Sequence, residues 1–192
     1  MEKIRKAVES IMKKNVKLLT LVTASMFLAV AYILPFFTGQ ISQIGNMLCP
    51  MHLPVLLCGF FCGAVWGGLV GIIAPILRSV TLGMPILFPT AICMAVELGT
   101  YGCVSGGLYR ILPKKKISVY LSLLTAMVAG RIVWGIAMLM CTGIGGNSFG
   151  IHAFLTSTVI NAIPGILLQI VLIPILVLIF DKNKLNSEQG SL

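Results

Sequence analysis

The stretch from Met51 to Val80, MHLPVLLCGFFCGAVWGGLVGIIAPILRSV, decides how the chain folds, because Arg78 is its only Lys, Arg, Asp or Glu. Its length exceeds the ~20 residues that one helix needs to cross a bilayer. The sequence GAVWGG (63–68) places three glycines near its middle, and glycine disfavours a continuous helix. The stretch is therefore either one long tilted helix or two short helices joined near these glycines.

The basic sequence RILPKKK (110–116) decides between these alternatives. Residues 1–17 hold six Lys and Arg side chains, which places this flank in the cytoplasm by the positive-inside rule. One helix across 51–80 would put RILPKKK outside the cell, whereas two helices put it inside together with the tail DKNK (181–184). Two helices also leave the outer segments 35–51, 80–88 and 141–152 without any Lys, Arg, Asp or Glu.

We therefore predict an all-α integral membrane protein with six transmembrane helices and with both the N and C termini in the cytoplasm. The expected helices cover about 16–35, 51–64, 67–81, 88–109, 117–140 and 152–180. Residues 1–15 form a basic cytoplasmic segment, 16–181 the six-helix domain and 182–192 a polar cytoplasmic tail. The N-terminal segment could begin a signal peptide, but the apolar run that follows it is long enough to span a membrane, so we expect it to be retained.

The composition excludes several classes of protein. Hydrophobic residues make up 58% and charged residues 10% of the chain, and the mean hydropathy is +1.03, which is unlike a soluble domain. The net charge of +9 sits in the flanks and one loop, as topology determinants do, so it does not indicate nucleic acid. Neither an HExxH nor a Walker motif occurs, so we expect no enzyme.

The six cysteines raise the question of a metal site. Cys58 and Cys62 lie one helical turn apart, but no His, Asp or Glu lies close by in sequence to complete a ligand shell. We expect the cysteines to act as small apolar side chains in membrane helices, and we expect neither a metal nor a cofactor in this chain.

Ionisable residues at membrane depth are candidates for function, because burying them in a bilayer is costly. Helical rise places Glu97 and Arg131 about 14–15 Å below the outer ends of their helices, and Asn161 about 14 Å below His152. These three side chains, from different helices, should meet at one level. They either orient a polar ligand or, for Glu97 and Arg131, simply neutralise each other.

Further side chains extend this candidate pocket. Tyr101 shares a helical face with Glu97, and Trp134 shares one with Arg131. Arg78 has no carboxylate nearby in sequence, so it either binds an anionic ligand or extends to the outer surface. His52 and His152 lie at the outer ends of two helices and are either ligand contacts or interfacial capping residues.

The region Asn46–Arg110 resembles the substrate-binding S component of an energy-coupling factor (ECF) transporter. The resemblance rests on HLPVLLCGFFCG (52–63), GLVGIIAPILRS (68–79) and PTA…ELGTYG (89–102). It implies a membrane subunit that captures a vitamin or related micronutrient at the outer face of a prokaryotic plasma membrane. It also implies three partner subunits, namely a transmembrane coupling subunit and two ATPases that use the ATP.

The resemblance further implies a face of small residues on the first helix that docks the coupling subunit. Thr20/Ala24 and Ser25/Ala29 have the four-residue spacing, but they lack the family's two alanines, and ordinary packing within the monomer is the alternative.

The sequence says less about the ligand. Arg78 favours a carboxylate or phosphate, and Trp134, Tyr101 and the methionines favour a planar or apolar part. Pantothenate is our first expectation, and pyridoxine-type vitamins, folate-like acids and riboflavin remain open. The alternative function is a stand-alone facilitator or channel. The nearly apolar sequence IVLIPILVLIF (170–180) argues against a polar path through the membrane.

Overall fold

The computed structural model describes residues 2–39, 50–113, 115–144 and 163–189, and within them the side chains of 15–37, 50–113, 115–142 and 164–180. The elements are α1 (Glu2–Gly39), α3 (His52–Cys62), α4 (Ala64–Leu82), the π-helical turn η1 (Leu87–Ala91), α5 (Ile92–Ile111), α6 (Lys116–Ile144) and α8 (Ile163–Gln189). This part of the chain contains no strand, which confirms the all-α prediction.

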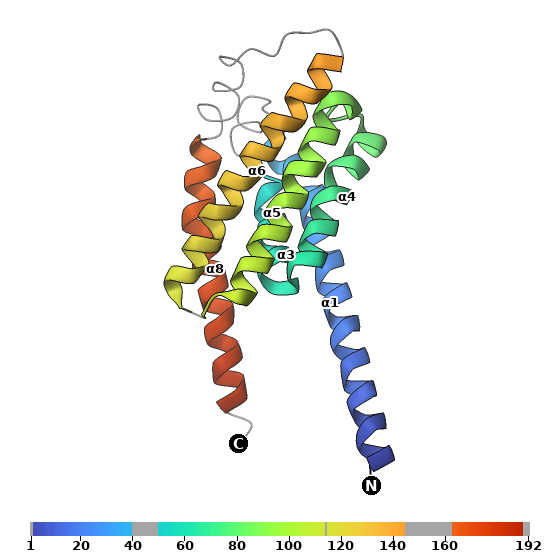
Figure 1. Ribbon diagram of the computed structural model, residues 1–192, viewed down its shortest axis with the longest axis vertical. Coiled ribbons are helices and arrows are strands. Elements are labelled where there is room, and N and C mark those ends of the chain that lie inside the picture. Colours follow the sequence, from blue (N-terminus) through green and yellow to red (C-terminus); the bar gives the residue numbers. More distant parts are fainter. Residues whose placement is uncertain (1, 40–49, 114, 145–162, 190–192) are drawn as a thin grey trace.

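The helices form a bundle around α5, which packs against α3, α4 and α6 (Figure 1). α1 contacts α3 and α4, and α8 contacts α6 and α3. Large apolar side chains cover the outside, including Leu19, Val80 and Ile117, each more than half exposed. Such a surface is unfavourable in water and is typical of a helix bundle whose solvent is lipid.

Four of the described helices are long and apolar enough to cross a membrane. Their candidate spans are Asn15–Phe37, Ala64–Leu82, Leu87–Ile111 and Lys116–Thr142. The helices His52–Cys62 and Pro164–Phe180 are apolar but shorter. The described residues thus support a multi-pass membrane protein.

The chain reverses at Gly63, as the glycines of the opening stretch predict. Gly63 has φ 92°, a left-handed conformation that other residues adopt at a cost, and its N–H donates to the carbonyl of Gly59 at 2.9 Å. A Cβ built on Gly67 would lie only 2.7 Å from the Cα of Gly59. Because these two glycines lie at equal distances on either side of Gly63, α3 and α4 run antiparallel in close contact.

Arg110, in the last turn of α5, secures this reversal. Its Nη2 atom donates to the carbonyl oxygen of Cys62 at 2.9 Å. The carbonyls at a helix C-terminus lack intrahelical partners and carry partial negative charge, so a guanidinium satisfies and neutralises them. The end of α5 therefore holds the point at which the chain turns from α3 into α4.

The helices extend beyond the predicted spans at both ends of the chain. The predicted first span, 16–35, agrees with the candidate span Asn15–Phe37, whereas α1 already begins at Glu2, because the basic flank contains good helix formers and continues the span without a break. α3 and α4 meet at Gly63 alone instead of being separated by residues 65–66. α8 continues to Gln189, past the predicted end near Phe180. The predicted start of the last helix at His152 lies outside the described residues.

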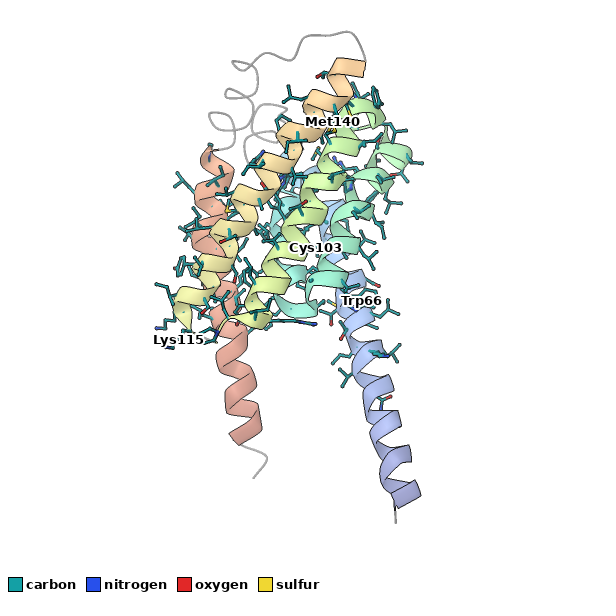
Figure 2. All side chains as sticks on the ribbon, in the orientation of Figure 1. Trp66, Cys103, Lys115 and Met140 are labelled. Atoms are coloured by element: carbon teal, nitrogen blue, oxygen red, sulfur yellow. The ribbon has the colours of Figure 1, made fainter. Side chains whose placement is uncertain are left out.

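The first residues of α1 and the last residues of α8 lie at the same end of the bundle, and both project beyond its other helices (Figure 1). Lys115 lies at that end as well, whereas Met140 lies at the opposite end of α6 (Figure 2). The three basic segments of the sequence are thus gathered at one end of the molecule.

Candidate functional site

A buried carboxylate, that of Glu97 on α5, is the centre of the candidate site. Its side chain is 2% exposed, and its Oε1 atom lies 3.1 Å from Nη1 of Arg131 on α6. The hydroxyl of Tyr101 donates to the same oxygen at 3.0 Å. Nε2 of His52, the first residue of α3, lies 3.5 Å from it. Three helices therefore direct polar side chains at one oxygen atom, and we call His52, Glu97, Tyr101 and Arg131 the Glu97 cluster.

The local sequence explains how this geometry arises. Glu97 and Tyr101 lie four residues apart on α5, so they occupy one face of the helix and can hydrogen-bond directly. Gly130 precedes Arg131 on α6, and any side chain there would overlap the Tyr101 ring. The ring of His52 packs on that of Tyr101 with a centroid separation of 5.2 Å and an interplanar angle of 58°.

The electrostatics of the cluster follow from these contacts. A carboxylate in an apolar bundle is costly unless it is paired and hydrogen-bonded. Arg131 supplies the opposite charge, and Tyr101 supplies a hydroxyl donor. With a neutral imidazole, the cluster carries one negative and one positive charge, so it can offer both acceptors and donors to a polar molecule.

Two features of the cluster indicate where a ligand would bind. The Arg131 side chain is 19% exposed, whereas His52 and Glu97 are 4% and 2% exposed, so Arg131 is the accessible charge. Neither ring nitrogen of His52 has a hydrogen-bond partner among the described residues. Buried polar groups are nearly always satisfied, so an imidazole left in this condition is a candidate contact for a bound molecule.

The prediction that Glu97 and Arg131 meet is confirmed, and so is the placement of Tyr101 beside Glu97. His52 is buried against the cluster, so the alternative of an interfacial cap does not describe it. Trp134 is half-buried and lies one turn along α6 from Arg131. Asn161 and His152 lie outside the described residues.

The structure does not bring Arg78 together with these side chains, which corrects the prediction of a single site. Its Nη1 atom donates to the backbone carbonyl of Tyr32 on α1 at 3.1 Å, and its guanidinium lies over the Phe36 ring, 5.1 Å from the centroid. The reason is that Arg78 lies on the face of α4 that packs on α1. Helical rise predicts a depth for Arg78 but not the direction of its side chain.

The four predicted docking residues separate into two pairs. Ala24 is 2% exposed within the core, and the carbonyl of Thr20 lies 3.8 Å from Sγ of Cys62 on α3. Ala24 thus packs inside the monomer and offers no surface to a partner, which corrects that part of the prediction. Ser25 and Ala29 are exposed and line a groove between α1 and α4.

Sequence reasoning missed two arrangements. Tyr32 and Thr81 join α1 to α4 through their hydroxyls, 3.0 Å apart, and Arg110 caps α3. Tyr32, a tyrosine near the end of an apolar span, was the available signal for the contact with Thr81. Among the described residues, no group of three or more His, Cys, Asp and Glu side chains could hold a metal ion.

Comparison with known proteins gives one match. A family model described as "ECF transporter, substrate-specific component" matches residues 19–177, which is most of the chain and includes the whole Glu97 cluster. Neither the curated proteins nor the solved structures give a significant match.

Proposed function

Because the chain belongs to the family of ECF transporter substrate-specific components, we propose that it captures a water-soluble vitamin or related micronutrient at the outer face of a prokaryotic plasma membrane. Partner subunits then drive uptake with ATP, which this chain does not itself use. The observation that carries the proposal is the Glu97 cluster, in which three helices direct polar side chains at one buried oxygen.

The proposed orientation has both termini in the cytoplasm and six passes. It is supported by the gathering of the two helix ends and Lys115 at one end of the bundle (Figures 1 and 2). Positively charged segments stay on the cytoplasmic side during insertion. The Glu97 cluster then lies toward the outer side, because His52 begins α3 at the end opposite to Cys62 and the Arg110 cap.

The proposed partners are a transmembrane coupling subunit and two cytoplasmic ATPases. Family membership supports an association with such a module. Ser25 and Ala29 are the candidate contacts with the coupling subunit, because small exposed residues at four-residue spacing allow two helices to approach closely.

Pantothenate remains the first candidate ligand. Its carboxylate would meet Arg131, the accessible cation of the cluster, and its hydroxyl or amide groups would meet His52. Trp134 and Tyr101 supply the apolar wall that such a pocket needs. Arg78 is not part of this proposed site, since its contacts are with α1.

The experiment is mass spectrometry of the small molecule that the purified full chain retains, followed by binding measurements with that molecule. We expect a vitamin-like compound with a polar or anionic group, and we expect Arg131→Gln to weaken its binding by about 1.5–3 kcal/mol, the scale of a charge-assisted hydrogen bond. The matched control is Lys115→Gln, a cation at the opposite end of the bundle, which should leave the affinity unchanged. Equal affinities for Arg131→Gln and wild type would remove the cluster from the site.

Liposomes containing only this chain separate the binding subunit from a stand-alone facilitator. A binding subunit retains ligand but gives no flux until coupling and ATPase subunits are added. Downhill flux through the chain alone would favour the facilitator instead.

A further inference from the structure

A groove on the surface of the bundle lies apart from the Glu97 cluster. It has a volume of about 390 Å³ and lies between α1 and α4. Its walls are apolar or small, formed by Leu28, Ile33 and Leu77 together with Ser25 and Ala29. From Ser25 to Tyr32 it follows α1 for about 10 Å, given the rise of 1.5 Å per residue.

The groove ends in polar groups. Thr81 donates to the carbonyl of Leu77 at 2.8 Å, so the hydroxyl of Tyr32 donates to Thr81 across the 3.0 Å between them. Arg78 lies on the same stretch of α4 and donates to the carbonyl of Tyr32 through Nη1. One end of the apolar groove therefore carries two hydroxyls, and Arg78 lies next to this end, bonded to the backbone of Tyr32, without lining the groove itself.

The charge of Arg78 is not neutralised by a carboxylate of the described residues, none of whose Asp or Glu side chains lies within ion-pair distance of it. Its other guanidinium N–H groups have no hydrogen-bond acceptor among these residues either. A half-buried guanidinium in a membrane is costly without an anionic partner or access to water. Its surroundings thus favour a negatively charged group from outside the chain.

The side chains around the groove indicate which molecule supplies this negatively charged group. Ile33, Leu77 and Val80 around it are exposed apolar side chains that face the hydrocarbon of the bilayer. Tyr32 and Phe36 lie beside Arg78, and aromatic side chains are enriched at the level of the headgroups. The molecules that surround a membrane protein at this level are phospholipids, whose anionic part is a phosphate and whose apolar part is an acyl chain.

We propose that, in the subunit that is not docked to its coupling subunit, the groove between α1 and α4 binds one anionic phospholipid of the outer leaflet, with its phosphate on Arg78 and an acyl chain along Ser25, Ala29 and Leu77. A phosphate matches the donors of a guanidinium, and the chain fills a groove that is otherwise lined by small and apolar side chains. The proposal relies on the proposed membrane orientation but not on which vitamin the Glu97 cluster binds.

The test is native mass spectrometry of the purified full chain from mixed micelles of phosphatidylglycerol and phosphatidylcholine with identical acyl chains. We expect phosphatidylglycerol to be retained in preference by roughly tenfold. Both lipids offer a phosphate to Arg78, but the quaternary ammonium of phosphatidylcholine neutralises its phosphate and is repelled by the guanidinium. Arg78→Gln should abolish this preference. The matched control Lys115→Gln, which removes an exposed cation at the basic end, should keep it.

A second variant tests the groove itself without altering the cation. Ala29→Phe places a ring where the acyl chain would lie, and it should reduce the retention of both lipids, since Ala29 is exposed and lines the groove. Thermal unfolding of each variant checks the fold. If Arg78→Gln does not fold, the retention of the two lipids by Ala29→Phe tests the proposal.

The proposal is overturned if Arg78→Gln leaves the phosphatidylglycerol preference intact or if Ala29→Phe retains both lipids as wild type does. Retention of the vitamin-like compound is recorded in the same spectra. If the expected preference for phosphatidylglycerol is not observed while the vitamin-like compound is still bound, the lipid site alone is rejected. Absence of the compound with lipid preference intact rejects the proposed function alone.

Discussion

The carboxylate of Glu97 has partners on three sides, so removing its charge affects several side chains at once. In Glu97→Gln, the guanidinium of Arg131 loses the anion 3.1 Å away while remaining largely buried. We expect a loss of roughly 2–3 kcal/mol in stability, somewhat below the value for fully buried pairs because Arg131 is partly exposed. The midpoint of thermal unfolding in detergent measures this.

The double variant Glu97→Gln/Arg131→Met is the control for that prediction. It removes both charges, so it should unfold at a higher temperature than Glu97→Gln alone. An unfolding midpoint of Glu97→Gln equal to that of wild type, combined with lost ligand affinity, would instead assign the pair to ligand binding.

The hydroxyl of Tyr101 can be removed with little change in packing. In Tyr101→Phe the ring keeps its contacts with His52 and Gly130, and the hydrogen bond to Glu97 is lost. We expect a destabilisation of about 1.5 kcal/mol, as for other hydrogen bonds to charged groups. Tyr120→Phe is the matched control, because Tyr120 is 40% exposed on α6, and it should unfold as wild type does. Equal midpoints for all three proteins would contradict the prediction.

Helical rise was sufficient to predict the meeting of Glu97 and Arg131, because both lie on long regular helices and their depths are fixed by counting residues. It was not sufficient for Arg78. The rotation of α4 about its axis is set by close packing on α1 and α5, and this packing leaves no periodic mark in one sequence. His52 was ambiguous for a related reason, since a residue at a helix start can cap the helix or turn inward.

Among the elements, α3, α4 and α5 are in the closest contact. A Cβ built on Gly102 of α5 would overlap the backbone of Gly67 on α4, and backbone cannot move aside as a flexible side chain can. Gly102→Ala should therefore lower the stability by at least about 2 kcal/mol, as overpacking in a core does. The yield of folded protein in detergent and its unfolding temperature measure this.

Gly107 provides the matched control on the same helix. The nearest atom to a Cβ built there is Cβ of Ala64 at 3.9 Å, an ordinary van der Waals contact. Gly107→Ala should fold as well as wild type or slightly better, since alanine favours a helix over glycine by up to about 1 kcal/mol. Similar behaviour of the two alanine variants would show that α4 and α5 are farther apart than described.

The elements themselves could be predicted more readily than their ends. The glycines around Gly63 indicated a reversal, because a left-handed residue ends a helix and glycine adopts that conformation most easily. The length of α1 could not be predicted from hydropathy, because a helix continues wherever its residues favour it, whether or not they enter the membrane. The π-helical start before α5 gave no distinct signal in the sequence.

For the molecule as a whole, the arrangement of its ends predicts which surfaces face the cytoplasm. Lys115→Cys in a background without native cysteines should react with a membrane-impermeant thiol reagent in inside-out vesicles and not in intact cells. Met84→Cys, which follows the end of α4 and is 71% exposed in wild type, should react in intact cells. Reaction of Lys115→Cys in intact cells would invert the proposed topology.

The close contacts of Gly67 with Gly59 and Gly102 have a consequence for the motions that are open to the bundle. Backbones that are already in contact cannot approach each other further. Arg110 of α5 also joins α5 to the end of α3 through its hydrogen bond to the carbonyl of Cys62. A motion that releases a ligand from the Glu97 cluster would therefore carry α3, α4 and α5 as one unit. The deformation would fall to α1 and α8, which pack less extensively on the rest of the described bundle.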